Sequence, residues 1–507
     1  MLFKGKWRID GLLGLIAVGA GLALAQLFAS LKSGLNTPVV SIGNRVIDHV
    51  PASVKEFAIR TFGVDDKRAL VTTIYLVVLI LAIFIGRSYF SGKQRQARTI
   101  VIVMTGIAAL SSLFDAKAGI LSLAPSIGAG GATIWVLHLL DNRNDKTDTS
   151  TETLNRRDLL KTISYVGVGS ITAMTVGNFF RNHASVQVQR LNIILPKALK
   201  FLPAPPKDPA VATPGLSKLF TPNKEFYRID TAIVIPNINL DSWRLQIFGM
   251  VGKPREYTYK EITDRPVFEL DDTIACVSNE VGGPLVGNAR WLGIRLDDLI
   301  KEAAPYSAAD QVMGYSDDGF SAGFPLAALD GRDAMIAIGM NGEPLPLEHG
   351  FPARIIVPGL YGYVSATKWL TKIELTRFDR AQGYWVPRGW SAQAPIKTQS
   401  RIDTPINSST VKAGKQVIAG VAWAPTRGIS KVEVKIGANP WRVATLGPAV
   451  AKTTWRQWWI DWDAIPDKAS ISVRATDGTG ALQSSKNVPV APNGAEGWHT
   501  VYINVAT

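Results

Sequence analysis

The sequence predicts a multi-domain protein with about five membrane-spanning helices, a mixed α+β domain and a β-sandwich of immunoglobulin type. Long apolar segments, which predict the membrane helices, occur only before about residue 185. Beyond about residue 225, short apolar runs alternate with turn residues, as in a mixed α+β domain. From about residue 400, strand-like runs follow one another at regular spacing, which is typical of a sandwich.

The composition agrees with a chain that is part membrane helix and part soluble domain. Hydrophobic residues make up 47% and charged residues 19% of the 507 residues, and the mean hydropathy is positive at +0.12. Five apolar segments come close to the ~20 residues that a helix needs to cross a bilayer. These predicted spans cover residues 11–31, 69–86, 99–114, 118–140 and 159–180.

The positions of the Lys and Arg residues predict how the spans are oriented in the membrane. Lys and Arg gather before the first span, between the second and third, and between the fourth and fifth. Cytoplasmic loops carry this excess, so five crossings place the C-terminal part outside. We therefore expect a multi-pass protein of a bacterial cytoplasmic membrane, with its C-terminal part on the extracytoplasmic side. The third segment is short, and four crossings would reverse this orientation.

A second signal before the fifth predicted span supports export. Residues 155–161 read NRRDLLK and precede a moderately apolar run, which resembles a twin-arginine export signal. The alternative is a cytoplasmic-side anchor that contains Arg-Arg by chance. We assign residues 1–184 to a transmembrane region that includes this internal signal.

The exported part divides by composition into three segments. Residues 185–220 include PKALKFLPAPPKDPAVATPG, which is typical of an extended linker. A domain over 221–395 contains the runs TAIVIP, RLQIFGMV, RIIVPG and WLTKIELT, with a helical stretch at 295–304. The predicted sandwich takes 396–507. No basic run with interleaved aromatic residues occurs in the exported part, so we expect no nucleic-acid binding despite a net charge of +14.

One cysteine, Cys276, stands in the stretch ACVSNEVGG. It could be an inert buried thiol, a nucleophile or a metal ligand. Its polar and Gly-rich neighbours, among them Asn279, count against the inert thiol, because such a loop lets backbone approach a ligand closely. A nucleophile would need a base such as His349. A lone thiolate cannot build a closed zinc site, but it could give one ligand to a metal that a cofactor holds.

Four ordered segments carry a resemblance to a known family. They are TPNKEFYRIDT at 221–231, CVSNEVGGPLVGNARWLGIRLDDLI at 276–300, YSDDG at 315–319 and LPLEHGFPARIIVPGLYGYVSATKWL at 345–370. Together they resemble the sulfite oxidase family of molybdopterin enzymes, over roughly residues 215–505. In that family a cysteine thiolate binds molybdenum beside the dithiolene sulfurs of the pterin. The resemblance implies a catalytic domain at 221–395 with one molybdenum-molybdopterin per chain and Cys276 as the metal ligand.

The resemblance also implies the site residues. Cys276, His349, Arg290 and Arg388 would act in catalysis, the two arginines by attracting an oxyanion substrate. Arg, Lys and backbone N–H groups would hold the pterin phosphate. The alternatives are structural ion pairs for Arg354 and Arg388, and a satisfied loop histidine for His349. The implied cofactor-binding residues are Asn223, Phe226, Tyr227, Arg228, Cys276, Asn279, Asp317, His349, Arg354, Ser365, Thr367 and Lys368.

The implied activity is two-electron oxygen-atom transfer. Sulfite oxidation is the first candidate reaction, and reduction of an S-oxide or N-oxide, such as methionine sulfoxide, is the second. The chain has no CxxCH motif and no cysteine set for an iron–sulfur cluster. We therefore expect no haem or iron–sulfur cluster in this chain and an external redox partner, either a cytochrome or a quinone-linked protein.

Other functions and assemblies stay open. The protein could be a non-catalytic envelope binding or assembly module, or a thiol hydrolase that uses Cys276 and His349. The last domain resembles one that mediates homodimers in the family, so a homodimer is expected. The alternative is that this domain clamps the catalytic domain.

Overall fold

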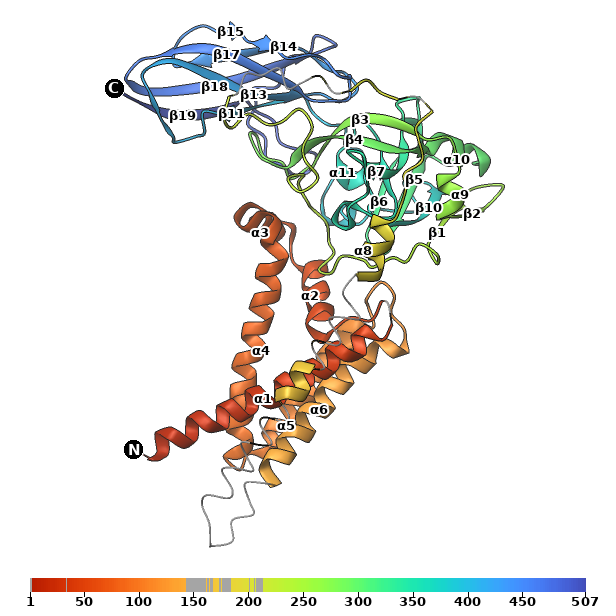
Figure 1. Ribbon diagram of the computed structural model, residues 1–507, viewed down its shortest axis with the longest axis vertical. Coiled ribbons are helices and arrows are strands. Elements are labelled where there is room, and N and C mark those ends of the chain that lie inside the picture. The colour runs from red at the N-terminus through yellow and green to blue at the C-terminus, as the bar shows by residue number, and fades with distance from the viewer. Residues whose placement is uncertain are drawn as a thin grey trace. The chain divides into compact units, whose positions relative to one another are not determined.

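The computed structural model describes residues 2–32, 34–142, 184–199, 201–204, 206 and 213–507, with short pieces between 161 and 175. Two compact units are present (Figure 1). The first comprises Met1–Val188 and Thr231–Asn237, and the second comprises Gln189–Asp230 and Ile238–Thr507. The twin-arginine motif, except Lys161, and most of the predicted fifth span lie outside the described residues.

Long helices build the first unit. α1 packs against α4 and α6, and α5 packs against the same two helices. Glycines allow close approach where α1 crosses α4, since a Cβ on Gly14 would lie 2.1 Å from the Ala82 carbonyl oxygen. The elements of this unit are α1 (Leu2–Ser30), α2 (Pro38–His49), α3 (Ala52–Phe62), η1 (Gly63–Asp65), α4 (Asp66–Phe90), α5 (Gln94–Ser112), η2 (Ile120–Leu123) and α6 (Ala124–Asn142).

Three of the predicted spans coincide with helices that could cross a membrane. Among the described residues, the helices long and apolar enough are Ile9–Ser30, Asp66–Phe90 and Ile120–Asp141. The predicted span at 99–114 lies mostly on α5, which is helical but is not one of these three. The number of five spans stays a prediction.

Helices also occupy the connection between the first two predicted spans. α2 begins after Thr37, whose hydroxyl accepts a hydrogen bond from the Val40 N–H at 3.4 Å, a typical N-cap. Ser41 and Asn44 of α2 donate to the carboxylate of Asp115 at 2.6 and 2.9 Å. This buried carboxylate fixes α2 beside the end of α5.

The run TAIVIP forms no strand, so that prediction was wrong. Residues 231–237 pack with the first unit instead. A Cβ on Gly43 of α2 would lie 2.5 Å from the end of the Ile233 side chain. A short apolar run is satisfied by packing on a helix as well as by a sheet, and the sequence does not distinguish the two.

The second unit begins with a domain of two sheets. One sheet has the order β2-β1-β10-β5-β6, and the other has the order β3-β4-β7-β8 with β9 paired to β7. The runs RLQIFGMV, RIIVPG and WLTKIELT form β1, β9 and β10, and α10 lies within the predicted helical stretch. The boundary between the two units falls within α8 (Ala184–Leu191). The elements that follow are β1 (Arg244–Gly249), β2 (Arg255–Thr258), α9 (Tyr259–Thr263), β3 (Phe268–Ala275), β4 (Val286–Arg295), α10 (Leu296–Glu302), β5 (Gln311–Ser316), β6 (Ser321–Pro325), η3 (Leu326–Ala328), β7 (Met335–Met340), β8 (Glu343–Pro344), η4 (Leu347–His349), β9 (Arg354–Ile356), α11 (Gly362–Ser365), β10 (Leu370–Thr376) and η5 (Val386–Arg388).

Two facing sheets follow as a β-sandwich, drawn in blue in Figure 1. Their orders are β11-β13-β17-β16 and β12-β19-β18-β14-β15. Side chains of both sheets, such as Ile418, Trp458 and Val473, form one buried core. The immunoglobulin type stays a prediction. The strands are β11 (Gln399–Thr404), β12 (Thr410–Lys412), β13 (Gly414–Trp423), β14 (Ile429–Ile436), β15 (Arg442–Val443), β16 (Thr445–Leu446), β17 (Arg456–Ala464), β18 (Asp467–Asp477) and β19 (His499–Ala506).

Truncation of a core isoleucine tests this packing. Ile418 is 0% exposed and Ile465 is 75% exposed, so the two isoleucines differ chiefly in burial. We expect Ile418→Ala to lower the free energy of unfolding by ~2–5 kcal/mol and Ile465→Ala to change it little. Denaturant titration of the detergent-purified protein, followed by tryptophan fluorescence, measures both. Equal effects of the two variants would contradict the assigned core.

Candidate active site

Cys276 directly follows β3 and opens a loop that returns to β4. Its thiol is buried. The Cys276 N–H donates to the Leu285 carbonyl at 2.9 Å, and the Asn279 N–H donates to the Cys276 carbonyl at 3.1 Å. The Asn279 side-chain oxygen accepts from the Leu285 N–H at 2.7 Å. These bonds close residues 276–285, here named the thiol loop, into a ring that fixes the position of the sulfur.

Two glycines let this loop fit against its surroundings. Gly282 has φ +78°, and a Cβ there would lie 2.2 Å from the His499 ring. A Cβ on Gly283 would lie 2.6 Å from the Asn279 side-chain oxygen. The Gly283 carbonyl accepts a hydrogen bond from Arg401 at 2.8 Å. Both His499 and Arg401 belong to the sandwich, so the sandwich helps to shape the thiol loop.

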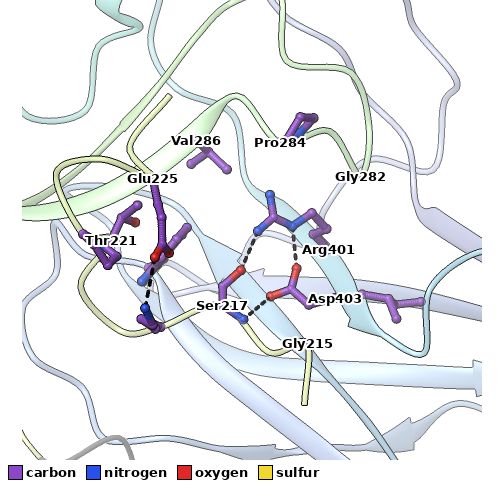
Figure 2. Close-up of a pocket in the computed structure, with 13 residues that line it drawn as sticks. Gly215, Ser217, Thr221, Glu225, Gly282, Pro284, Val286, Arg401 and Asp403 are labelled. Carbon is purple, nitrogen blue, oxygen red and sulfur yellow. Dashed lines mark hydrogen bonds and ion pairs between the residues drawn. The ribbon is translucent and has the colours of Figure 1, made fainter. Parts of the chain in front are cut away.

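A pocket of about 340 Å³ lies beside the thiol loop, with Arg401 in its wall (Figure 2). Arg401 pairs with Asp403 at 2.6 Å and donates to the Ser217 hydroxyl at 2.9 Å. The Ser217 N–H donates to Asp403 at 3.0 Å. One arginine thus connects the segment before the catalytic domain, the thiol loop and the sandwich.

Further contacts hold the sandwich to the thiol strand β3. The Trp455 N–H donates to the Thr273 hydroxyl at 2.7 Å, and the indole N–H of Trp455 donates to the Leu219 carbonyl at 2.7 Å. The Thr273 N–H donates to the Thr453 carbonyl at 3.0 Å. The sandwich therefore contacts β3 just upstream of Cys276 as well as the loop downstream of it.

A buried arginine without an acidic partner lies in β9. Arg354 donates to the carbonyls of His349 at 3.1 Å and Ala366 at 3.4 Å, and its Nε has no hydrogen-bond partner. Within the described part of the chain, no carboxylate forms an ion pair with it. Its guanidinium lies 5.1 Å from the centre of the Trp291 ring. Burial lowers the pKa of Arg354 to about 10, which Tyr227 partly opposes.

A second buried cation, Lys368, lies close by. Its ammonium group donates to Asp230 at 2.6 Å and to the Glu348 carbonyl at 3.2 Å. Asp230 also accepts from Arg228 at 2.8 Å. Burial lowers the pKa of Lys368 to about 8, although Asp230 acts in the opposite direction. Arg354, Lys368 and Arg228 are here named the cation cluster. Lys368 and Arg228 share the carboxylate of Asp230, whereas no carboxylate of the described residues pairs with Arg354, so the cluster keeps an excess of positive charge.

Tyr227 lies between the thiol and the cation cluster. Burial raises the pKa of Tyr227 well above its usual value, the Cys276 charge raises it further and Arg354 lowers it. Its ring stacks on Phe226 with a centroid distance of 5.4 Å. Phe226 lies across Gly287, where a Cβ would come within 2.7 Å of the phenyl ring. The thiol, an aromatic pair and the cation cluster thus follow one another through the buried site.

His349 ends η4 with its ring buried. Its Nε2 lies 2.9 Å from the Asn223 carbonyl, and its ring meets Phe226 edge to face at 5.6 Å. Burial lowers the pKa of His349 to about 4, so the ring is neutral near pH 7. Because a carbonyl only accepts hydrogen bonds, the proton is on Nε2 and Nδ1 is the acceptor. The Asn223 side chain in turn accepts from Asn341 at 2.8 Å.

Three of the predicted cofactor residues mainly make backbone contacts. Ser365 donates to the carbonyls of Leu360 at 3.1 Å and Tyr361 at 3.0 Å. The Thr367 carbonyl accepts from the Ile355 N–H at 3.0 Å. The Asp317 N–H donates to the Trp369 carbonyl at 2.8 Å. These contacts shape the segments around the cation cluster.

The two arginines predicted to attract substrate are both engaged within the protein. Arg290 makes a bidentate pair with Asp271, both bonds at 2.8 Å, and donates to the Pro203 carbonyl at 2.9 Å. Alternation along β3 places Asp271 and Arg290 on the face opposite to Cys276. Arg388 donates to the Tyr384 carbonyl at 2.5 Å, and its guanidinium lies 3.7 Å from the centre of the Tyr384 ring.

Three residues near the site were missed from the sequence. Burial raises the pKa of Tyr361 to about 12, with a contribution from the Cys276 charge. Burial also raises the pKa of Asp318, which Asp230 and Lys368 influence in opposite directions. Asp272 is buried on the Cys276 face of β3, has one oxygen without a partner, and burial raises its pKa well above the usual value. An Asp-Asp pair inside an apolar strand was the available sequence signal.

Comparison with known proteins identifies the family of the domain that carries Cys276. The family model for the oxidoreductase molybdopterin binding domain matches residues 232–385. "Uncharacterized oxidoreductase YuiH" of Bacillus subtilis is 32% identical over 152 residues, which cover 30% of this chain and 74% of that protein. Human mitochondrial sulfite oxidase is 26% identical over 339 residues, 56% of this chain. The chain belongs to the sulfite oxidase family of molybdopterin-dependent oxidoreductases.

The matched region, residues 232–385, is the molybdopterin-binding domain of an oxidoreductase family. The chain spans 62% of the length of human sulfite oxidase. In fold it is similar to the sulfane dehydrogenase SoxCD from Paracoccus pantotrophus, with a TM-score of 0.51, 20% identity, and coverage of 64% of this chain and 92% of that one.

The residues present fit the family's cofactor. A buried thiol suits a soft metal, and the partnerless Nε of Arg354 suits a phosphate oxygen.

The lowered pKa of Lys368 predicts pH-dependent cofactor uptake. Lys368 is charged below about pH 8 and loses its proton above it, so its attraction for a phosphate weakens as pH rises. We expect roughly tenfold weaker uptake of molybdopterin by apo-protein at pH 9 than at pH 7. Lys368→Arg, which stays charged, should take up the cofactor equally at both pH values.

The contribution of Lys368 to the stability of the apo-protein changes with pH in the opposite direction to cofactor uptake. Unfolded lysine holds its proton to about pH 10.4, so between about pH 8 and that value the unfolded state binds more protons. The contribution of Lys368 to folding therefore becomes more favourable with rising pH in this range. Equal pH dependence of uptake in wild type and Lys368→Arg would show that another group is responsible.

Gly282 offers a test of the thiol loop. Gly282→Ala adds a Cβ in a left-handed backbone and against the His499 ring, whereas Gly480→Ala has a similar φ of +90° and open space. Each should cost ~1–2 kcal/mol through the backbone, but only Gly282→Ala should reduce bound molybdenum. Metal analysis and thermal unfolding separate the two effects. The double variant Gly282→Ala/His499→Ala should regain part of the metal, and equal metal loss in Gly480→Ala would contradict this role.

Proposed function

We propose that this protein is a membrane-anchored, extracytoplasmic enzyme that transfers an oxygen atom to or from sulfur, with sulfite oxidation as its first candidate activity. The observation that carries the proposal is the closed thiol loop beside a buried cluster of cations with excess positive charge. When bound, the molybdenum-pterin group supplies the two-electron redox centre. Sulfite and water would give sulfate, two protons and two electrons.

The chain's own residues take distinct parts in this proposal. Cys276 binds the metal through its sulfur. The cation cluster holds the pterin phosphate, because arginine and lysine bind phosphate oxygens through charge-assisted hydrogen bonds. Tyr227 and Phe226 cover the pterin between phosphate and metal. Neutral His349 orients this wall through its bond to Asn223. Asn279 and the backbone around Ser365, Thr367 and Asp317 fix the loops.

Substrate attraction is assigned to Arg388 rather than to both arginines. Arg290 is neutralised by Asp271 on the opposite face of β3, which supports a structural role. The guanidinium of Arg388 lies on the Tyr384 ring, a contact that does not neutralise its charge.

Reduction of an S-oxide is the second candidate, and the groups near the thiol favour it. Tyr227 and Tyr361 both interact electrostatically with Cys276, and burial keeps both phenols neutral. Neutral hydrogen-bond donors suit the oxygen of a sulfoxide, whereas sulfite requires compensating cations. Methionine sulfoxide is one substrate of this class.

The two electrons require an external carrier in this proposal. The relatives include sulfite oxidases, and a cytochrome or a quinone-linked protein would serve here. Three apolar helices support the membrane anchor, and the cationic loops together with residues 155–161 support an exported catalytic part.

Metal and pterin analysis of wild type and Cys276→Ser is the decisive experiment. We expect about one molybdenum per chain in wild type made by a host that produces the cofactor, and loss of activity in the variant. Alkylation of Cys276 should also be slower in metal-loaded than in metal-free protein, whereas in a thiol hydrolase the metal supply would not change its rate. Folded and exported wild type without pterin would overturn the proposal.

Substrate assays then separate the two candidates. Sulfite with an artificial electron acceptor tests oxidation, and methionine sulfoxide with a chemically reduced electron donor tests reduction. Turnover of only one substrate decides the direction. Arg388→Met should raise the KM for sulfite several-fold and leave that for a neutral sulfoxide unchanged, and the same change for both would remove the assigned role of Arg388.

A further inference from the structure

A row of exposed apolar side chains follows α8 at the start of the second unit. Ile194 is 94% exposed, Leu199 is 79% exposed and Phe201 is 64% exposed. Leu191, at the end of α8, is also exposed. These four residues are named the apolar row. Single exposed apolar residues are common, but four within eleven positions of one segment are more than the usual scatter and favour contact with another surface.

The segment that carries the apolar row is fixed to the catalytic domain. Buried Arg190 donates to the carbonyls of Leu345 and Pro344, both at 2.8 Å. The Leu199 N–H donates to the Val267 carbonyl at 3.0 Å, and the neighbouring Ala198 is buried.

Farther along, the Leu202 N–H donates to Glu269 at 2.8 Å. Arg290 donates to the Pro203 carbonyl at 2.9 Å. The backbone is therefore held on the domain surface at several points, while the side chains of the apolar row point away from it. A merely extended linker would not need these contacts.

The position in the chain identifies what covers the apolar row. The predicted fifth span ends near residue 180, and α8 fills most of the distance to Leu191. Its eight residues extend only about 12 Å as a helix. The first residue of the row therefore follows the end of the predicted span by only about eleven positions of the chain. Lys197, exposed within the same segment, is suited to the phosphate groups of lipid headgroups.

We propose that the apolar row inserts into the headgroup region of the extracytoplasmic leaflet and docks the catalytic domain on the membrane surface. This proposal rests on the membrane anchor of the proposed function. Interfacial segments of this kind combine apolar side chains with basic ones and bury the apolar side at the boundary between headgroups and acyl chains. Insertion of the apolar row would do more than anchor the protein. A span alone would leave the catalytic domain free to rotate relative to the membrane, whereas the inserted row would fix its orientation.

Spin labelling of the full-length protein in lipid nanodiscs tests the proposal. A nitroxide is attached to the new cysteine of Ile194→Cys and of Leu199→Cys. The collision rate of each nitroxide with oxygen, which is enriched in lipid, is then compared with its collision rate with a water-soluble nickel complex. Two exposed positions serve as controls, Leu79→Cys on α4 and Ile406→Cys in the sandwich, which is 69% exposed. Wild type treated with the same label measures any reaction at buried Cys276.

We expect labels at Ile194 and Leu199 to collide several-fold more with oxygen, relative to nickel, than the label at Ile406. If both resemble Ile406 while Leu79 reports lipid, the apolar row is in water; the anchor then stands and this inference fails. Immobile labels shielded from both reagents would show that protein covers the row, which also overturns the inference. If the label at Leu79 gave the same collision rates as the label at Ile406, the membrane anchor itself would be contradicted.

Discussion

The catalytic domain depends on a positive charge that it buries and does not neutralise. Arg354 is almost entirely removed from solvent, and among the described residues no carboxylate pairs with it. Two carbonyls and the face of Trp291 offset part of the cost. A buried charge with an incomplete set of partners destabilises the fold unless an anion completes the set. The phosphate of the family's cofactor is such an anion, and binding of it at Arg354, as proposed, would couple cofactor binding to the stability of this domain.

The same constraint explains why Lys368 differs from Arg354. Lys368 has Asp230, which it shares with Arg228, so this corner of the site is closer to neutral without any ligand. A phosphate that enters between the two regions would meet one cation that lacks a partner and two that share one. The arrangement favours an anion while it keeps the charge of the apo-protein low enough for folding.

The sandwich fixes the backbone of the thiol loop and does not contribute a reacting group to it. Arg401 binds the Gly283 carbonyl, the His499 ring occupies the space where a Gly282 side chain would be, and Trp455 binds Thr273 of β3. The thiol loop is therefore restrained from both of its ends by a domain that is distant in sequence. The clamp that the sequence suggested as an alternative to a dimer contact agrees with these bonds, and the homodimer stays a prediction.

The sequence predicted those parts of the site that lie within short segments. Cys276 and its glycines are neighbours, and Arg354, Thr367 and Lys368 lie within one run of fifteen positions. It did not predict pairs that the fold brings together. Asp230 meets Lys368 across 138 positions, and Asp271 meets Arg290 only because of the β3-β4 register. Asp317 and Asp318 are adjacent in the turn between β5 and β6, and a sequence motif does not show that Asp318 is the one that Asp230 and Lys368 influence.

The same limit applies to the fold. Strands with alternating burial, such as β17 and β18, lie where the sequence predicted the sandwich, whereas the structures of the run at 231–236 and of the connection that holds α2 were not predicted. An apolar run indicates that a segment is buried, but the partner that buries it decides between helix, strand and irregular backbone.

The single cysteine has a physical explanation in these terms. Burial raises the pKa of the Cys276 thiol, and only the contacts with Ser278 act against this. A buried, protonated thiol reacts slowly with oxidants and electrophiles, because the thiolate is the reactive form. With one cysteine in the chain, no intrachain disulfide competes for it. A metal that binds the sulfur must displace its proton, so the thiol stays unreactive until the metal arrives and becomes a thiolate only as a ligand.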